Sequence, residues 1–138
     1  MLTFFDSSAF AKRFIEETGS DEIEKICLES NSIALSSICF PEIISALNRR
    51  LRENNITKKE YLLIKDKMLE EFDSLEIINV VLEVISKAII LLEKHNLRTL
   101  DALHVASAIV WNAELFVSAD KRQTLAAKKA GLKVKLIV

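Results

Sequence analysis

The chain has 138 residues, of which 50% are hydrophobic, and its 19 basic and 20 acidic residues give a formal net charge of −1. This length fits one domain, which would bury roughly two thirds of the surface that the unfolded chain exposes. The hydrophobic fraction is high for a small monomer, so we expect an apolar patch that binds a partner. The two glycines, Gly19 and Gly131, are too few for a P-loop or a G-x-G-x-x-G dinucleotide motif.

The sequence shows no membrane or export signal. The longest apolar run, residues 88–92, is far shorter than the roughly 20 residues that span a bilayer. The N-terminus lacks the basic region of a signal peptide. We therefore expect a cytoplasmic protein that does not enter a membrane. Cys27 and Cys39 form no C-x-x-C pair, and we expect both to be small buried side chains.

Short apolar runs alternate with helical periodicity from the start of the chain. The first third predicts a strand over 2–5, a helix over 7–17, a helix over 20–29 and a strand over 32–36. Gly19 should end the first of these helices, and Ser20 should cap the second. Pro41 suits the first turn of a further helix that ends near residue 53.

The remaining elements follow the same alternation. Thr57 and Glu60 have the spacing of a capping box, which predicts a helix over 57–72. Thr99 should cap a helix that ends at Trp111, and Gly131 should follow the last helix as a left-handed residue. The sequence also predicts strands over 75–79, 115–118 and 133–137, and helices over 81–94 and up to residue 130.

This β/α alternation predicts one α/β domain over residues 1–138. We expect a mostly parallel central sheet of four to five strands, flanked by helices and connected by right-handed crossovers. No linker, repeat or low-complexity segment interrupts the pattern.

Four acids, Asp6, Glu42, Asp101 and Asp120, each lie where a predicted strand meets a helix or in the first turn of a helix. In a doubly wound sheet such positions meet in one crevice at the carboxyl edge. Clustered carboxylates repel one another unless a cation neutralises them, and Mg²⁺ or Mn²⁺ prefers oxygen ligands. A bound ion could support phosphodiester hydrolysis. For Glu42 or Asp120 alone, the helix macrodipole is a sufficient explanation.

Four segments in order resemble the PIN-domain family, and more narrowly its VapC-type toxins: LTFFDSSAFAKRF, SSICFPEIISAL, TLDALHVASA and FVSADKRQTLAAKKAGLKV. The resemblance implies a metal-dependent ribonuclease with Asp6 and Asp101 as metal ligands. By resemblance Glu42 matches the family's helix-start glutamate and Asp120 its fourth acid. We infer that Glu42 orients or activates water and that Asp120 completes the acidic site or a second ion site. The resemblance also implies a homodimer inhibited by a cognate antitoxin protein.

Other residues near the acids have smaller expected roles, and the resemblance gives His104 no metal role. Ser8 and Ser118 match hydroxyl positions that support the acids, although helix capping explains them equally well. His104 lies three residues after Asp101 and could join the site, but a packing or interfacial role is favoured. The apolar stretches 61–72 and 81–92 are candidates for dimer and antitoxin contacts. Basic residues near the acids could bind RNA phosphates: Lys12, Arg13, Arg49, Arg50, Arg52, Arg98, Lys121 and Arg122.

Two alternatives remain beside the toxin. The same nuclease could act in RNA maturation or decay, or the acidic pocket could belong to a noncatalytic cation-binding interaction module. A haloacid-dehalogenase-like phosphatase is disfavoured because Ser7 and Ser8 follow Asp6 where that fold has a D-x-D arrangement.

Overall fold

The computed structural model describes residues 1–138 and contains one five-stranded sheet with the order β3-β2-β1-β4-β5, all strands parallel. The strands are β1 (Leu2–Phe5), β2 (Ser32–Ser36), β3 (Glu76–Ile78), β4 (Leu115–Ser118) and β5 (Val134–Leu136). The helices are α1 (Ser7–Phe10), η1 (Ala11–Arg13), α2 (Ser20–Glu29), α3 (Cys39–Arg52), α4 (Lys58–Glu71), η2 (Phe72–Ser74), α5 (Leu82–Lys94), α6 (Thr99–Trp111) and α7 (Lys121–Lys129). The predicted parallel α/β domain is confirmed.

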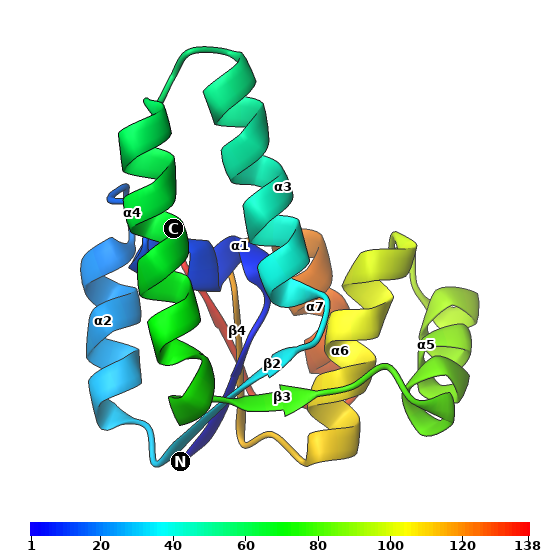
Figure 1. Cartoon of the computed structure of the whole chain (residues 1–138). Coiled ribbons are helices and arrows are strands. Elements are labelled where there is room, and N and C mark those ends of the chain that lie inside the picture. The colour runs from blue at the N-terminus through cyan, green and yellow to red at the C-terminus, as the bar shows by residue number, and fades with distance from the viewer.

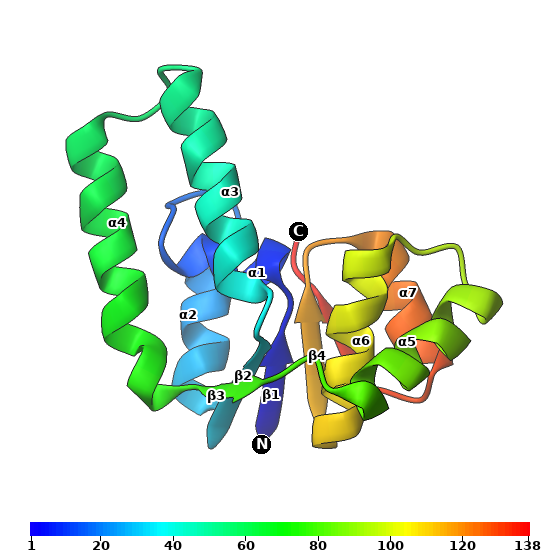
Figure 2. The ribbon, with the colours of Figure 1, turned by 45° about the vertical axis from the view of Figure 1, so that its right-hand side comes forward.

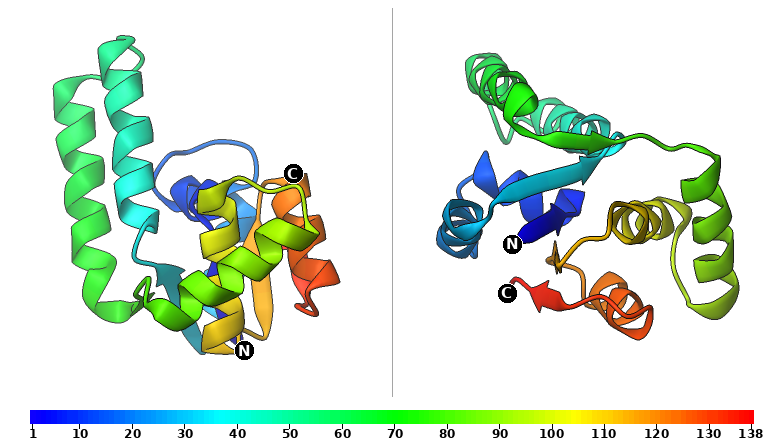
Figure 3. Two further views of the ribbon diagram at one scale, coloured as in Figure 1. Left: turned by 90° about the vertical axis from the view of Figure 1, so that its right-hand side faces the viewer. Right: turned by 90° about the horizontal axis from the view of Figure 1, so that it is seen from below.

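Helices cover both faces of the sheet (Figures 1 and 3). Phe4 and Phe5 point to opposite faces because side chains alternate along a strand. Phe5 joins a core with α1 to α4, whereas Phe4 joins a second core with α5, α6 and α7. This double burial explains why the central strands are mostly apolar rather than alternating between apolar and polar residues.

The topological switch point of the sheet, where the strand order reverses, lies between β1 and β4. From β1 the chain adds β2 and β3 on one side, then crosses over to β4 on the other. In such sheets, ligands bind at the carboxyl edge beside this switch point. Figure 2 shows α3 and α4 as an antiparallel hairpin that rises beyond this edge, with α5, α6 and α7 across from it.

Three local predictions were wrong. The helix predicted over 7–17 ends at Phe10, continues as the short η1, and gives way to an irregular turn. Ser20 is the first helical residue rather than the cap, because its hydroxyl accepts from the Glu17 N–H and donates to the Ile15 carbonyl. Such side-chain bonds compete with the helical pattern. Thr99 likewise begins α6, and its predecessor Arg98 occupies the cap position.

Other end signals act as expected. The Thr57 hydroxyl and the Glu60 carboxylate form the predicted capping box of α4. Gly131 follows α7 with a φ of 100°. Cys39 is buried as expected, whereas Cys27 is only half-buried, so the prediction was wrong for Cys27. Burial raises the pKa of the Cys39 thiol to about 12 and that of the Cys27 thiol to about 11. None of the helices has the length and apolar character needed to cross a bilayer.

Replacing Gly19 with Ala should destabilise the protein more than replacing Gly131 with Ala. Both glycines have φ near +100°, so each Ala carries a backbone cost of about 1–2 kcal/mol. A Cβ at Gly19 would also lie 2.5 Å from Cγ2 of the buried Ile137, whereas a Cβ at Gly131 meets nothing within 4 Å. We expect the excess loss at Gly19 to be about 1–3 kcal/mol in urea unfolding. Equal losses would contradict the close packing at Gly19.

Candidate active site

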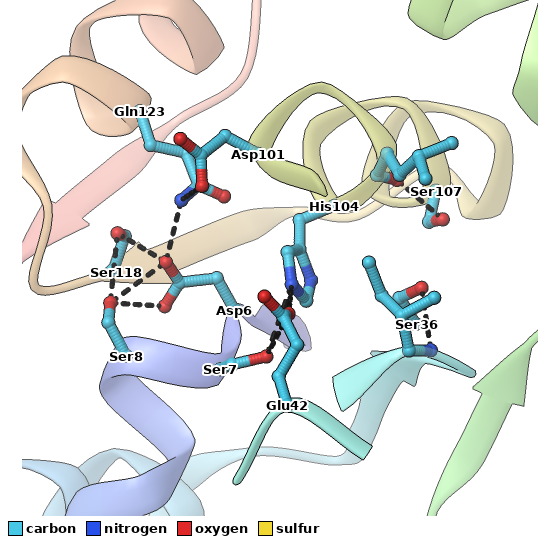
Figure 4. Close-up of polar contacts among 12 residues, drawn as sticks. Asp6, Ser7, Ser8, Ser36, Glu42, Asp101, His104, Ser107, Ser118 and Gln123 are labelled. Atoms are coloured by element: carbon cyan, nitrogen blue, oxygen red, sulfur yellow. Dashed lines mark hydrogen bonds and ion pairs between the residues drawn. The ribbon is translucent and has the colours of Figure 1, made fainter. Parts of the chain in front are cut away.

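The four acids predicted from the sequence lie near the carboxyl edge of the sheet, although they do not form one compact cluster. Figure 4 shows three of them, Asp6, Glu42 and Asp101. Asp6 directly follows β1, and its N–H extends the ladder to the Val117 carbonyl of β4 at 3.1 Å. Glu42 and Asp101 lie in the first turns of α3 and α6. Asp120 is the N-cap of α7. The chain therefore brings carboxylates from four distant segments to one edge.

The Asp6 carboxylate is the buried centre of the site, with 1% of the residue exposed. It accepts hydrogen bonds from the Ala9 N–H at 2.9 Å, the Ser8 hydroxyl at 2.9 Å, the Ser118 hydroxyl at 2.7 Å and the Gln123 amide at 2.9 Å. Burial raises the pKa of Asp6, while the charge of His104 and the hydrogen bonds from Ser118, Ala9 and Ser8 act in the opposite direction. The donors come from α1, β4 and α7, so the position of the carboxylate depends on the whole edge.

Gln123, which the sequence analysis missed, links two of the acids. Its Nε2 donates to Asp6 Oδ2 at 2.9 Å and to Asp101 Oδ1 at 3.3 Å, while its Oε1 is buried without a partner. The residue is only 2% exposed. Its position three residues after Asp120, in the first turn of α7, was the available signal. An amide donor shared by two carboxylates marks the place where their negative charges converge.

Asp101 and Asp120 share a more open part of the site. Burial and the negative charge of Asp120 both raise the pKa of Asp101. Asp120 Oδ1 accepts from the backbone N–H groups of Arg122 at 2.8 Å and Gln123 at 3.3 Å. The capping explanation of Asp120 is therefore confirmed, and the same carboxylate also adds negative charge near Asp101. The two interpretations are compatible.

Glu42 belongs to a second polar network. Its Oε1 accepts from the Ser7 hydroxyl at 2.6 Å and from His104 Nε2 at 2.5 Å. Burial would raise the pKa of Glu42, but the hydrogen bonds from His104 and Ser7 and the His104 charge outweigh it and lower that pKa. An ionised carboxylate can only accept hydrogen bonds. The proton of the hydrogen bond between Glu42 and His104 therefore lies on Nε2 of His104.

His104 is thus part of the polar site and not only a packing residue. The sequence analysis favoured packing, and the 2% exposure of His104 agrees with that. The sequence analysis did not predict the hydrogen bond between His104 and Glu42, because this contact depends on how α3 is placed relative to α6. Nδ1 of His104 is buried and has no partner.

The serines support the acid, whereas the alternative that they cap the following helices was wrong, because the N-caps of α1 and α7 are Asp6 and Asp120. Ser8 and Ser118 donate to Asp6, while their oxygens accept from the backbone N–H groups of Ala119 at 3.1 Å and Asp120 at 3.0 Å. Each hydroxyl therefore fixes the acid and orders the turn after β4 at the same time.

The donor chemistry fits a hard divalent cation. Carboxylate oxygens are the ligands that Mg²⁺ and Mn²⁺ prefer, and Mg²⁺ usually keeps several waters beside one or two carboxylates. No three His, Cys, Asp or Glu side chains lie close enough together to hold an ion by themselves. Asp6 and Asp101, bridged by one amide, are the pair with the right chemistry.

Several basic residues predicted to contact RNA already have partners. Arg13 pairs with Glu71 and Glu24, at 2.8 and 2.9 Å, and Lys12 pairs with Glu17 at 3.3 Å. Arg50 lies 3.8 Å from Glu17. The remaining predicted residues form no ion pair within the chain: Arg49, Arg52, Arg98, Lys121 and Arg122. Intramolecular pairing therefore makes Lys12 and Arg13 poor candidates for RNA contacts.

Taken together, the fold and site define a doubly wound parallel α/β domain with an acidic centre at its topological switch point. The PIN-domain family profile matches residues 3–129, so the chain belongs to the PIN-domain family. It is 32% identical over 136 residues to "Ribonuclease VapC45" of Mycobacterium tuberculosis, covering 96% of this chain and 94% of that protein.

Solved structures agree with the fold. VapBC2 from Rickettsia felis, bound to a DNA fragment from its promoter, matches with a TM-score of 0.71 and 18% identity over 100% of both chains. The Mycobacterium tuberculosis toxin VapC20, described as cleaving the sarcin-ricin loop, matches with a TM-score of 0.69 and 15% identity over 94% of this chain and 95% of that one.

Replacing Asp101 with Asn should stabilise the metal-free protein at neutral pH. The raised pKa of Asp101 means that its ionised form is less favourable in the folded than in the unfolded chain. As the pH falls through the folded pKa towards the ordinary value of about 3.9, Asp101 takes up a proton and this cost disappears. The advantage of the variant in urea unfolding with EDTA should therefore shrink over that range.

The matched control is Asp66→Asn on α4, an exposed aspartate that should change stability little at either pH. A variant less stable than the wild type at neutral pH would contradict the assigned electrostatics of Asp101.

Proposed function

We propose that the protein is an Mg²⁺- or Mn²⁺-dependent endoribonuclease that acts as the toxin of a type II toxin–antitoxin pair. The observation that carries the proposal is the pair Asp6 and Asp101, held by one amide beside the topological switch point. Membership of the PIN-domain family and the similarity to a protein named as a ribonuclease support it. RNA is the proposed substrate.

Asp6 and Asp101 would hold the metal ion. The ion would supply charge stabilisation for the phosphoryl group and would lower the pKa of an attacking water. Asp6 is buried and fixed by four donor groups, so it would give a rigid ligand. Asp101 is more open and would complete the coordination beside Asp120.

Glu42 would act on the water. Its lowered pKa keeps the carboxylate ionised at neutral pH, so it can accept a proton. His104 and Ser7 fix the orientation of Glu42 through one of its oxygens, Oε1. His104 is therefore a positioning residue in this mechanism. Asp120 would add negative charge on the far side of Asp101 while it caps α7.

The nuclease assay compares the wild type with Asp101→Asn and Asp6→Asn on a panel of tRNA and rRNA. Metal-dependent cleavage should stop with EDTA. Each substitution should lower the cleavage rate by more than about 10- to 100-fold, the loss typical of substitutions at residues that only hydrogen-bond to a metal ligand. Asp66→Asn should keep wild-type activity, and circular dichroism checks that each variant folds.

Cleavage that persists in both variants would contradict the assigned metal ligands. Metal binding by calorimetry without cleavage of any RNA would favour the noncatalytic cation-binding module.

The proposed homodimer and antitoxin contacts rest on exposed apolar side chains. On α5, four of them recur at Leu82, Ile85, Ile89 and Leu92, with exposed fractions of 77%, 41%, 53% and 36%. Their i, i+3, i+7, i+10 spacing forms one stripe. On α4, Leu62, Leu63 and Leu69 are also exposed. Apolar stripes of this kind mark protein contacts. A structure described as a toxin–antitoxin complex from Klebsiella pneumoniae has the same fold, with a TM-score of 0.68.

Light scattering at micromolar concentration should find a dimer that Ile89→Asp converts to a monomer. A charge placed in an apolar contact would remain unpaired and desolvated. Leu28→Asp is the control, because Leu28 is an 80% exposed side chain on α2, away from this stripe. A monomeric wild type, or an Ile89→Asp dimer, would contradict the α5 contact.

A further inference from the structure

Two helices present matching stripes of side chains to one groove. On α5 the stripe is Lys87, Ile90, Leu91 and Lys94, and on α7 it is Arg122, Leu125, Ala126 and Lys129. Both have the spacing i, i+3, i+4, i+7, which places each set on one helix face. Each stripe has a cation at both ends and two apolar residues between them. Figures 2 and 3 show α5 and α7 on the same side of the sheet, next to α6.

The groove consists of two adjoining hollows. One has a volume of about 200 Å³ and is lined by Lys94, His95, Asn96, Arg122, Leu125, Ala126 and Lys129. The other has a volume of about 310 Å³ and is lined by Lys87, Ile90, Leu91, Lys94, His95, Ile109, Lys129 and Ala130. No aspartate or glutamate lines either hollow. The groove is therefore lined by basic and apolar side chains and by no acid.

The four cations of this basic groove are free of ion pairs within the chain. Lys87, Lys94, Arg122 and Lys129 form no salt bridge, in contrast to Lys12 and Arg13 on the other side of the sheet. The helix macrodipole favours Lys94 and Lys129, which lie in the last turns of α5 and α7. It does not account for Lys87 or Arg122, which lie earlier in their helices. Gathered like charges repel one another, and an anion in the groove would relieve that repulsion.

One end of the groove is linked to the acidic site through the first turn of α7. Arg122 immediately precedes Gln123, whose amide contacts Asp6 and Asp101. From Arg122 to Lys129 the groove follows α7 for about 10 Å, at 1.5 Å per residue. An anion bound near Lys94 and Lys129 would therefore lie away from the reacting phosphate, with Arg122 between the two regions.

We propose that the basic groove between α5 and α7 binds the backbone phosphates of single-stranded RNA that flank the cleaved bond. The proposal rests on the proposed ribonuclease function and adds a substrate subsite to it. Lys94, Lys129 and Arg122 contact phosphates without reading sequence, and the apolar side chains between them pack against sugars and bases. An acidic protein segment is the competing occupant. RNA is favoured because the groove gathers four unpaired cations and no acid, and because Arg122 at one end of it is the chain neighbour of Gln123, which contacts Asp6 and Asp101.

The test measures RNA binding separately from cleavage. A labelled single-stranded RNA is titrated with the full chain in EDTA, and binding is followed by fluorescence anisotropy over a series of salt concentrations. The double variant K94Q/K129Q is compared with the wild type and with K59Q/K65Q, which removes the same charge from exposed positions on α4. Thermal unfolding checks that all three proteins fold.

K94Q/K129Q should raise the Kd at low salt by on the order of 10-fold or more and reduce the slope of log K against log salt by about 1.4, since each phosphate contact on single strands contributes about 0.7. K59Q/K65Q should match the wild type. An unchanged Kd and slope in K94Q/K129Q would overturn the groove proposal. If that variant then also lost the binding of poly-glutamate, the occupant of the groove would be an acidic protein segment.

Failure of the groove proposal can be distinguished from failure of the proposed ribonuclease function. A wild type that cleaves RNA in Mg²⁺ while K94Q/K129Q binds RNA normally would overturn the groove alone. A wild type that neither binds nor cleaves any RNA would overturn both.

Discussion

The burial of the Asp6 carboxylate is the constraint on which the site depends. A buried charge is costly unless it is hydrogen-bonded. Here four donor groups satisfy it, and they come from α1, β4 and α7. These elements can supply donors only if β1 and β4 are neighbours and α7 begins at the same edge. The position of one carboxylate thus fixes the relative placement of the elements that bring the other acids near it.

Two short segments join the two polar networks. Adjacent serines on α1 serve different acids: Ser7 donates to Glu42, and Ser8 donates to Asp6. On α6, Asp101 and His104 lie three residues apart, so they share a helix face. One faces Gln123 and the other faces Glu42. The proposed metal pair and the proposed water-activating acid are therefore held by the same two helices, and a shift of either helix would disturb both.

The predictions from sequence succeeded where a local pattern was sufficient. The strand over 2–5, the capping box at Thr57 and the left-handed Gly131 all depend on residues close in the chain. The prediction over 7–17 was wrong because the Ser20 hydroxyl and the Lys12 ammonium bond to backbone carbonyls in the following turn. Helical periodicity contains no information about such competing bonds.

The sequence by itself determined the alternation of strands and helices and the position of each acid at the end of a strand or the start of a helix, because these are properties of short segments. Only the tertiary structure decided which side chains meet. It placed the Gln123 amide between Asp6 and Asp101, paired Arg13 with Glu71, and left Lys94 and Lys129 unpaired in one groove. The physical reason is that these contacts depend on strand order and on the rotation of each helix, which are fixed by packing between segments far apart in the chain.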